Sequence, residues 1–281
     1  MIATATEIEN FIEVYQIQHI SKAAIRLGIT QPSLTQSLQK LEEKVGAKLF
    51  YRSKQGLTAT QEGHLFYDRA RSLLDNWRDV GNQFLESRNV IAGKFRVGCH
   101  PSVACYTLPS LFSQINEHAP NIEIELVHDF SRKITEQIIS YQVDLGFVVN
   151  PVRHLDLVLK KIGEDEVQFW KSKTVATVPQ RIFADTNLKQ VEALLTKTIQ
   201  KDFKNWTLVP TSSLETAREL TAQGHGVCIL PTRVARNAKD PLTIYMKSLP
   251  TFHDEIYLAY RKEVLSSQAG RALIKLASNP I

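Results

Sequence analysis

Uncharged polar side chains occupy one face of a short segment, where an ordinary surface helix would carry Lys and Glu. In QPSLTQSLQK, residues 31–40, leucines keep helical spacing and amides and hydroxyls lie between them. Gln can form paired hydrogen bonds with adenine, and Ser or Thr can reach base edges or phosphates. Short neutral side chains also let a helix lie deep in the major groove. The pattern predicts a DNA-reading face made of Gln31, Pro32, Ser33, Thr35, Gln36, Gln39 and Lys40, with Ser21 beside it.

Three short helices are needed to position this face. The spacing of Ile8, Phe11, Ile12 and Tyr15 predicts a helix over residues 5–17 with one buried side. Ser21 is the expected N-cap of a second helix, whose inward residues are Ala23, Ala24 and Leu27.

A tight turn should join the second helix to the third. Gly28 can adopt the positive φ with which a helix ends, and Thr30 can cap the next helix. Pro32 then falls in the first helical turn, where its missing N–H does little harm. We expect Leu34, Leu38, Leu41 and Val45 to line the inner side of this third helix. Two short helices joined by such a turn form a helix-turn-helix.

Positive charge gathers around this motif. Between residues 21 and 54 the chain carries seven cations and two anions, a net charge of +5 that equals the charge of the whole chain. Such a local excess indicates a polyanionic partner. We expect phosphates to meet Lys40, Lys44 and the start of the third helix.

A basic hairpin follows. Residues 49–52 and 57–59 are predicted strands around a turn that contains Gly56. Beside a reading helix this hairpin would form a wing, with Arg52 and Lys54 on phosphates or in a narrow minor groove. The alternative is that these cations only increase solubility.

One long helix should follow from Thr60 to about Arg88, because apolar residues recur every three or four positions without an intervening proline. A rod of that length with an apolar stripe usually pairs with a partner. The expected pairing residues are Phe66, Leu73, Trp77 and Phe84. The alternative is packing against its own domain.

The rest of the chain alternates strands and helices. Strands at 95–99, 122–127 and 144–149 enclose helices near 104–118 and 131–141, which favours a parallel sheet. Ligands of such sheets bind at the carboxyl ends of the strands, here at 99–103, 128–132 and 147–150. A second set has strands at 181–184, 206–210 and 227–230 and helices at 187–200 and 212–223. Residues 242–249 and 255–262 should return to the first set, before a last helix at 266–277.

Composition excludes several classes of protein. No apolar run approaches the ~18 residues that span a membrane, and the polar start MIATATEIEN is unlike a secretion signal. Three cysteines without a C-x-x-C pair fit small buried residues in a reducing compartment. We therefore expect a cytoplasmic protein without a metal or other cofactor.

The order of these motifs resembles the LysR-type transcriptional regulators. The resemblance is carried by Ala23-Ala24, Gln31-Pro32, Leu41-Glu42, Gly46, Leu49-Phe50, Arg52, Thr60 and Gly63. It continues in GKFRVG, VDLGF and GHGVCILP further along the chain. Gln36 departs from the pattern, because many members carry a basic residue there.

The resemblance implies an α/β protein with three parts. Residues 1–58 would form a winged helix-turn-helix, residues 59–90 a linker helix for dimerisation, and residues 91–281 an effector domain similar to periplasmic binding proteins. Lobe one of that domain would take about 91–165 and 235–281, and lobe two about 166–234. Lobe two looks shortened after residue 173 by about one loop and helix.

The resemblance also implies a small-molecule effector in the cleft between the lobes. The expected contacts are His100, Pro101, Ser102, Val103, Ser131, Phe147, Asp185, Thr186 and Asn187, with His128 at the edge. The implied partners are double-stranded DNA with inverted-repeat half-sites, a second copy of the chain in a dimer or a tetramer, and RNA polymerase.

Two other classes of function were weighed. An enzyme on an α/β scaffold is disfavoured because the chain contains no G-x-S-x-G, H-E-x-x-H, P-loop or G-x-G-x-x-G motif. A receptor for solute transport is disfavoured by the cytoplasmic start and the basic N-terminal segment.

Overall fold

The computed structural model describes residues 3–53, 56–86, 91–198, 202–236 and 241–278, with side chains except at 52, 53, 72, 75–86 and 197. Its contacts divide the chain into two units. The first contains Met1–Val90 with Ser140–Gln142, and the second contains Ile91–Ile139 and Val143–Ile281.

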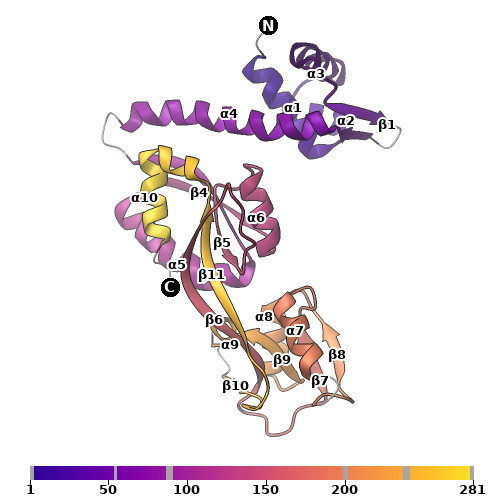
Figure 1. The fold of residues 1–281 in the computed structure, drawn as a ribbon, viewed down its shortest axis with the longest axis vertical. Coiled ribbons are helices and arrows are strands. Elements are labelled where there is room, and N and C mark those ends of the chain that lie inside the picture. Colours follow the sequence, from indigo (N-terminus) through magenta and orange to yellow (C-terminus); the bar gives the residue numbers. More distant parts are fainter. Residues whose placement is uncertain (1–2, 54–55, 87–90, 199–201, 237–240, 279–281) are drawn as a thin grey trace. The chain divides into compact units, whose positions relative to one another are not determined.

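The first unit has three short helices, a hairpin and one long helix, in the order that the sequence predicts (Figure 1). Its elements are α1 (Ala5–Ile17), α2 (Ile20–Leu27), α3 (Gln31–Val45), β1 (Phe50–Ser53), β2 (Gly56–Ala59) and α4 (Gln61–Glu86).

Most of the predicted helix ends of this unit are confirmed. Gly28 ends α2 with φ 68°, and the Thr30 hydroxyl caps α3 by accepting a hydrogen bond from the N–H of Ser33. Two expectations are wrong. The N-cap of α2 is His19, because Ser21 lies inside the helix and its hydroxyl bonds to Gln31 instead. Val45 is 40% exposed in the last turn of α3, beyond the buried stripe of leucines.

A single core joins the three helices, the hairpin and the start of α4. Phe11 is fully buried at its centre and meets Phe66 of α4 edge to face, with ring centroids 5.0 Å apart. Phe66 is therefore half-buried within its own unit. Leu73 is 56% exposed, and the side chains of Trp77 and Phe84 lie outside the described residues.

The second unit contains one mixed sheet with helices packed against it. In lobe one lie β3 (Ala92–Cys99), α5 (Pro101–His118), β4 (Asn121–His128), α6 (Ser131–Ile139) and β5 (Leu145–Val149). In lobe two lie β7 (Arg181–Ala184), α7 (Lys189–Thr198), β8 (Thr207–Pro210), α8 (Leu214–Ala222), β9 (Val227–Pro231), α9 (Thr232–Arg236) and β10 (Leu242–Ile244). The remaining elements are β6 (Val158–Ser172), β11 (Phe252–Tyr260), the 3-10 helix η1 (Lys262–Ser266) and α10 (Gln268–Ala277).

Each lobe is built on parallel strands, as the alternating pattern predicts. In lobe one β3 pairs in parallel with β4 and β5, and in lobe two β7 pairs in parallel with β8 and β9. Each of these strands except β5 is followed by a helix that packs back onto the sheet, so that apolar residues fill both faces.

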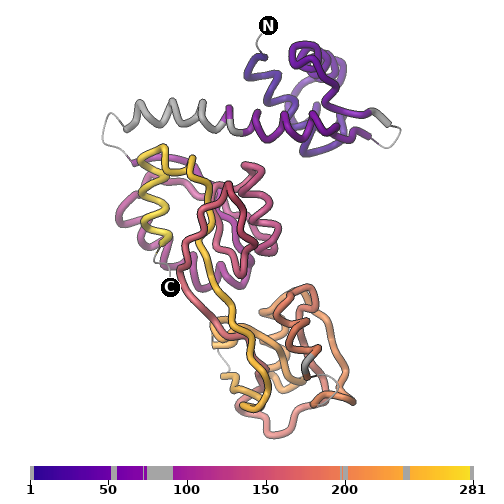
Figure 2. The backbone as a smooth tube through the Cα atoms, viewed as in Figure 1, coloured from indigo at the N-terminus to yellow at the C-terminus, as the bar shows by residue number. Residues whose placement is uncertain are grey.

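Two long antiparallel strands join the lobes, and the sequence did not reveal their pairing. β11 pairs with β5 on one side and with β6 on the other, and β6 continues to pair with β9 and β10 (Figure 2). We expected residues 242–249 to begin the return to lobe one. Instead, β10 pairs with the end of β6 beside lobe two, and the return is made by β11.

The described part of the chain contains no helix that is both long enough and apolar enough to cross a membrane.

Gly63 provides a test of the packing between α4 and the wing. A Cβ at this position would lie 2.2 Å from the carbonyl oxygen of Leu49, which is backbone and cannot move aside alone. We expect Gly63→Ala to lower the free energy of unfolding of the first unit by about 1–3 kcal/mol, the usual effect of overpacking.

Chemical denaturation followed by circular dichroism measures this change. The control is Glu62→Ala, an exposed position in the same helical turn, which should change stability by less than about 0.5 kcal/mol. An exposed helical glycine would be stabilised by about 0.5–1 kcal/mol by the same change, so a gain at Gly63 would contradict this packing.

Candidate functional site

The exposed face of α3 carries the predicted reading residues. Leu34, Leu38 and Leu41 are buried on one side of the helix. Gln31, Pro32, Ser33, Gln36, Gln39 and Lys40 are exposed, and Thr35 is half-buried. The side chains of Gln36, Gln39 and Lys40 make no hydrogen bond or ion pair with any other residue that the structure describes. Their polar ends are therefore available to a partner.

The other polar residues at the start of α3 are held by each other. The Ser21 hydroxyl donates to the side-chain oxygen of Gln31 over 2.8 Å, and the hydroxyls of Thr30 and Ser33 are 2.8 Å apart. The bond from α2 fixes the orientation of the Gln31 amide and leaves its NH₂ group as a donor. Ser21 and Thr30 thus position neighbouring groups of the reading face.

Several of the cations near this face are already paired within the unit. The Lys44 ammonium binds both carboxylate oxygens of Glu7, at 2.8 and 2.7 Å, and its side chain is only 18% exposed. This pairing lowers the pKa of the Glu7 carboxyl. The expectation that Lys44 meets phosphates is therefore wrong, because its charge stabilises the contact between α1 and α3.

The wing is held by the carboxylate of Glu42, which belongs to the family pattern but had no predicted structural role. Glu42 is buried on α3, and its side chain accepts hydrogen bonds from the backbone N–H groups of Leu49 and Phe50 and from the Lys48 ammonium. At its other end the wing is tied to the turn after α1, where the N–H of Leu57 donates to the carbonyl of Gln18. The Arg52 side chain and Lys54 lie outside the described residues.

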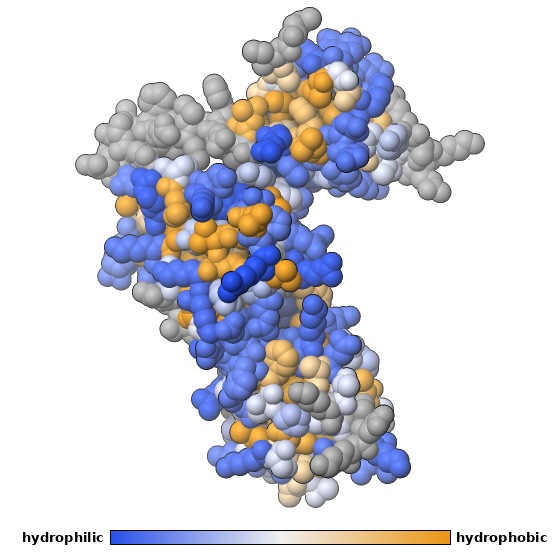
Figure 3. Space-filling view, viewed as in Figure 1, coloured by the Kyte–Doolittle hydropathy of each residue, from blue (hydrophilic) through white to orange (hydrophobic). Residues whose placement is uncertain are grey.

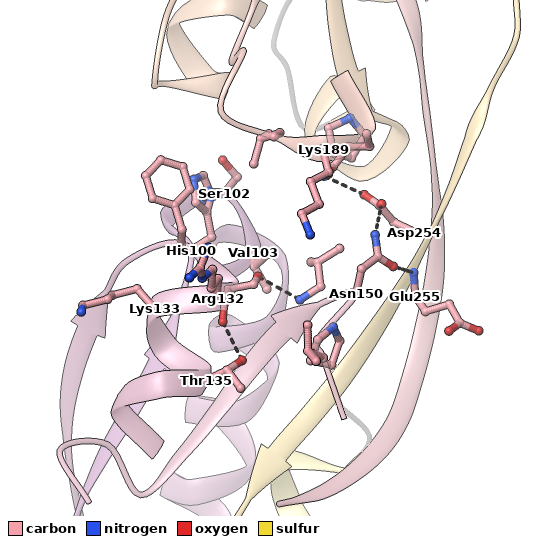
Figure 4. Close-up of a pocket in the computed structure, with 18 of the residues that line it drawn as sticks. His100, Ser102, Val103, Arg132, Lys133, Thr135, Asn150, Lys189, Asp254 and Glu255 are labelled. Atoms are coloured by element: carbon pink, nitrogen blue, oxygen red, sulfur yellow. Dashed lines mark hydrogen bonds between the residues drawn. The ribbon is translucent and has the colours of Figure 1, made fainter. Parts of the chain in front are cut away.

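A second candidate site is a cavity of about 1360 Å³ in the second unit, between the two lobes. Its walls come from the starts of α5, α6 and α7, the end of β5, the middle of β6 and the start of β11 (Figure 4). The carboxyl ends of the parallel strands meet here, where the sequence predicts a ligand site. Among the expected ligand contacts, His100, Ser102, Val103, Ser131 and Asn187 line the cavity.

Ser102 is the most informative of these residues. Its side chain is buried, and its hydroxyl has no hydrogen-bond partner among the described residues. His100 caps α5 by accepting a hydrogen bond from the N–H of Ser102 at Nδ1, and burial lowers the pKa of the His100 imidazole. Ser131 is different, because its hydroxyl accepts a hydrogen bond from the N–H of Val149 and ties α6 to β5.

Four expected contacts do not reach the cavity. Phe147 is fully buried among the apolar residues beneath α5 and α10, because alternate side chains of β5 face opposite helical layers. Asp185 is also fully buried, and its carboxylate accepts from the N–H and the amide of Asn187, which positions that loop. Pro101 and Thr186 are exposed but do not line the cavity, and neither does His128.

Two carboxylates at the floor of the cavity were missed. Asp165 of β6 and Asp254 of β11 lie directly opposite each other in the antiparallel pairing, and both line the cavity. In the sequence Asp165 belongs to the acidic run GEDE, which is typical of a solvated strand. No local signal identifies the pair, because it depends on the register of two strands about 90 residues apart.

Asp254 is the more deeply buried carboxylate, with 2% of its surface exposed. It accepts hydrogen bonds from the side-chain amides of Asn150 over 2.7 Å and Gln190 over 3.4 Å. Burial raises its pKa to about 6, and the charge of Asp165 adds to this shift while the Asn150 bond opposes it. Burial also raises the pKa of Asp165, although the N–H groups of Arg233 and Glu166 donate to its oxygens.

The raised pKa of Asp254 predicts how stability depends on pH. The folded protein holds this proton more tightly than the unfolded chain, so the contribution of Asp254 to stability increases as the pH falls from above 6 to below 4. A shift from 3.8 to about 6 corresponds to roughly 3 kcal/mol of unfolding free energy. We expect Asp254→Asn to stabilise the second unit near pH 8 by up to this amount, with the gain vanishing near pH 4.

Urea denaturation of wild type and variant at several pH values measures the difference. Glu123→Gln, at an exposed position of β4, is the control and should show no such pH-dependent difference. A variant that is less stable than wild type at pH 8 would show that Asp254 is well compensated in the folded protein.

Two family models match this chain. The model described as the LysR substrate binding domain covers residues 88–279, and the bacterial regulatory helix-turn-helix protein model of the lysR family covers residues 6–64. The first match alone spans more than half of the chain.

Curated relatives agree with these matches. The chain is 25% identical over 300 residues to the uncharacterized HTH-type transcriptional regulator YcgK of Bacillus subtilis, covering 96% of this chain and 92% of that protein. It is 35% identical over 163 residues to the HTH-type transcriptional regulator ShiR of Corynebacterium glutamicum, covering 57% of this chain and 54% of that protein.

Solved structures share the fold. A full-length OxyR variant from Pseudomonas aeruginosa superposes with a TM-score of 0.70 at 22% identity, covering 99% of this chain and 97% of the other. Full-length CbnR in complex with its target DNA gives a TM-score of 0.63 at 18% identity, with 98% of each chain covered. Together with the family models, these findings show that the chain belongs to the LysR family of DNA-binding transcriptional regulators with an effector domain, and that it is a regulator rather than an enzyme.

Proposed function

We propose that α3 enters the major groove of an operator and reads bases with Gln36 and Gln39. The observation that carries this proposal is the pair of exposed amides without partners among the described residues, on a helix whose opposite side is buried. A neutral amide can donate and accept at once, which suits the edge of adenine. Lys22 and Lys40 are exposed on the same motif and would meet phosphates, and the proposal gives the same role to Arg52 and Lys54 on the sequence pattern alone.

The chain acts as a homodimer through α4 in this proposal. Leu65 and Leu73 are 62% and 56% exposed on that helix, and Figure 3 shows a hydrophobic patch in the region of α1 and α4. Apolar side chains exposed along a long helix favour association with a second copy. Two reading helices related by a twofold axis fit an inverted repeat of half-sites, and two dimers would form a tetramer on longer operators.

The cavity between the lobes takes the effector. A volume of about 1360 Å³, with a buried hydroxyl that lacks a partner among the described residues, suits a small polar molecule. Such a molecule changes DNA binding only by binding one arrangement of the protein more tightly than another. RNA polymerase is the partner on which the changed complex would act, and the cytoplasm is the proposed location.

Single substitutions on α3 test the DNA-reading proposal. We expect Gln36→Ala and Gln39→Ala each to weaken binding to the preferred duplex by about 1–3 kcal/mol and to relax base preference at one position, because a bidentate base contact is lost. Fluorescence anisotropy with a duplex selected from a random library by the wild-type protein measures both effects.

Two further variants make this test specific. Lys40→Ala should weaken binding to all sequences alike and reduce the slope of log affinity against log salt by about 1. Gln223→Ala, at an exposed glutamine of the second unit, should leave DNA binding unchanged. Full affinity and full base preference in the Gln36 and Gln39 variants would rule out α3 as the reading helix.

A further inference from the structure

Two carboxylates lie opposite each other at the floor of the cavity. Asp165 and Asp254 are directly opposite in the antiparallel pair of β6 and β11, where like charges repel. Both are buried, at 9% and 2% exposure, so solvent screens their charges weakly. A cation is therefore expected between or beside them.

Asp165 lies near the positive charge of Arg233, although no ion pair joins their side chains in the described residues. Asp165 accepts a hydrogen bond from the backbone of Arg233, and the guanidinium of Arg233 lies 5.6 Å from the ring centre of Tyr106 on the same wall. The side chains that donate to Asp254, Asn150 and Gln190, are neutral. Within the described residues Asp254 forms no ion pair.

Exposed carboxylates of the same domain are better compensated. Glu255, the next residue along β11, pairs with Lys161 over 2.5 Å, and Glu136 of α6 pairs with Arg132 over 3.1 Å. Asp254, the more deeply buried carboxylate of the pair, is thus without an ion-pair partner among the described residues. Its position on the cavity wall means that a bound molecule can provide the missing charge.

An independent observation also points to a ligand. The Ser102 hydroxyl is buried and without a partner among the described residues, and it lines the same cavity at the start of the 18-residue helix α5. Figure 4 shows Ser102 and Asp254 apart from each other across the cavity. The N-terminus of a helix favours a negative group, whereas the floor at Asp254 favours a positive one.

We propose that the cleft binds an amino-acid-like zwitterion, whose ammonium group donates hydrogen bonds to Asp254 and whose carboxylate accepts one from the Ser102 hydroxyl. This inference rests on the proposed role of the cleft as the effector site and names the class of effector. A metal ion is a poorer candidate, because the described residues contain no group of three or more His, Cys, Asp or Glu side chains that could hold one.

Calorimetric titration of the full chain tests the inference with defined probes. L-alanine, L-lysine and L-arginine are each compared with the acid that lacks the α-amino group, such as propionate for alanine. We expect at least one amino acid to bind saturably and its deaminated partner to bind at least about tenfold more weakly, because the buried carboxylate then lacks its donor.

Variants locate the contact. Asp254→Asn should weaken binding of that amino acid at least about tenfold, and Ser102→Ala should weaken both the amino acid and the deaminated acid. The matched control is Glu164→Gln on β6, an exposed carboxylate beside Asp165 that pairs with Lys161. It should bind the amino acid as the wild type does. The comparison of probes on the wild-type chain does not depend on how the variants fold.

The inference is overturned if none of the amino acids binds at millimolar concentration, if the deaminated acids bind as tightly, or if Asp254→Asn binds like the wild type. Binding of the deaminated acids that Ser102→Ala weakens would leave the cleft as the effector site and reject only the zwitterion. Loss of the proposed DNA-reading role would be seen separately, in the anisotropy measurements on α3.

Discussion

The antiparallel pairing of β6 with β11 is the contact on which the second unit depends. Residues 158–167 of β6 pair with residues 252–260 of β11, and each strand then carries on to a different lobe. Through this pair the sheet becomes continuous, in the order β4-β3-β5-β11-β6-β9-β7-β8. The two strands also form the floor of the cavity, so the element that joins the lobes is the element that faces a ligand. A ligand held there would contact the two strands that connect the lobes, which offers a physical route from binding to a change of lobe arrangement.

The charges at the floor of the cavity fit a site where ligand binding favours one arrangement of the lobes. A buried carboxylate opposite another is destabilising in the free protein, and proteins keep such features mainly at functional sites. The hydrogen bonds from Asn150 and Gln190 reduce the free-energy cost of burying the charge of Asp254. They do not remove this cost, because both amides are neutral dipoles. Binding of a positive group would relieve the repulsion between the two carboxylates, and that free energy is available to favour one arrangement of the lobes.

The first unit is also stabilised by polar contacts between separate elements. The predicted reading face on α3 must remain accessible to DNA. The polar contacts that hold the elements of this unit together therefore lie away from Gln36 and Gln39. Glu42 holds the wing strands, Lys44 and Glu7 join α3 to α1, and Thr60 bonds to the carbonyl of Lys48 where α4 begins. Gly63 is needed because α4 approaches the backbone of Leu49 closely. The L-E and T-x-x-G elements of the sequence pattern are thus structural supports of the wing, whereas the exposed amides of α3 are the proposed readers of DNA.

The sequence by itself determined the local elements of this protein. Helical periodicity located α1, α3 and the start of α4, Gly28 and Thr30 marked helix ends, and alternating strands and helices predicted both sets of parallel strands. These features depend on residues within a few positions of one another, so a short stretch of sequence is enough to predict them. Only the tertiary structure decided which charges are free and which are paired. Lys44 and Lys40 look alike in the sequence, yet one lies against Glu7 of another helix and the other faces solvent. Phe147 was expected at the cavity and is buried in the core, whereas Asp254, which no local signal identified, lines the cavity. Strand register and the layers above each face set which side chain reaches the cavity, and both depend on segments that are distant in the chain.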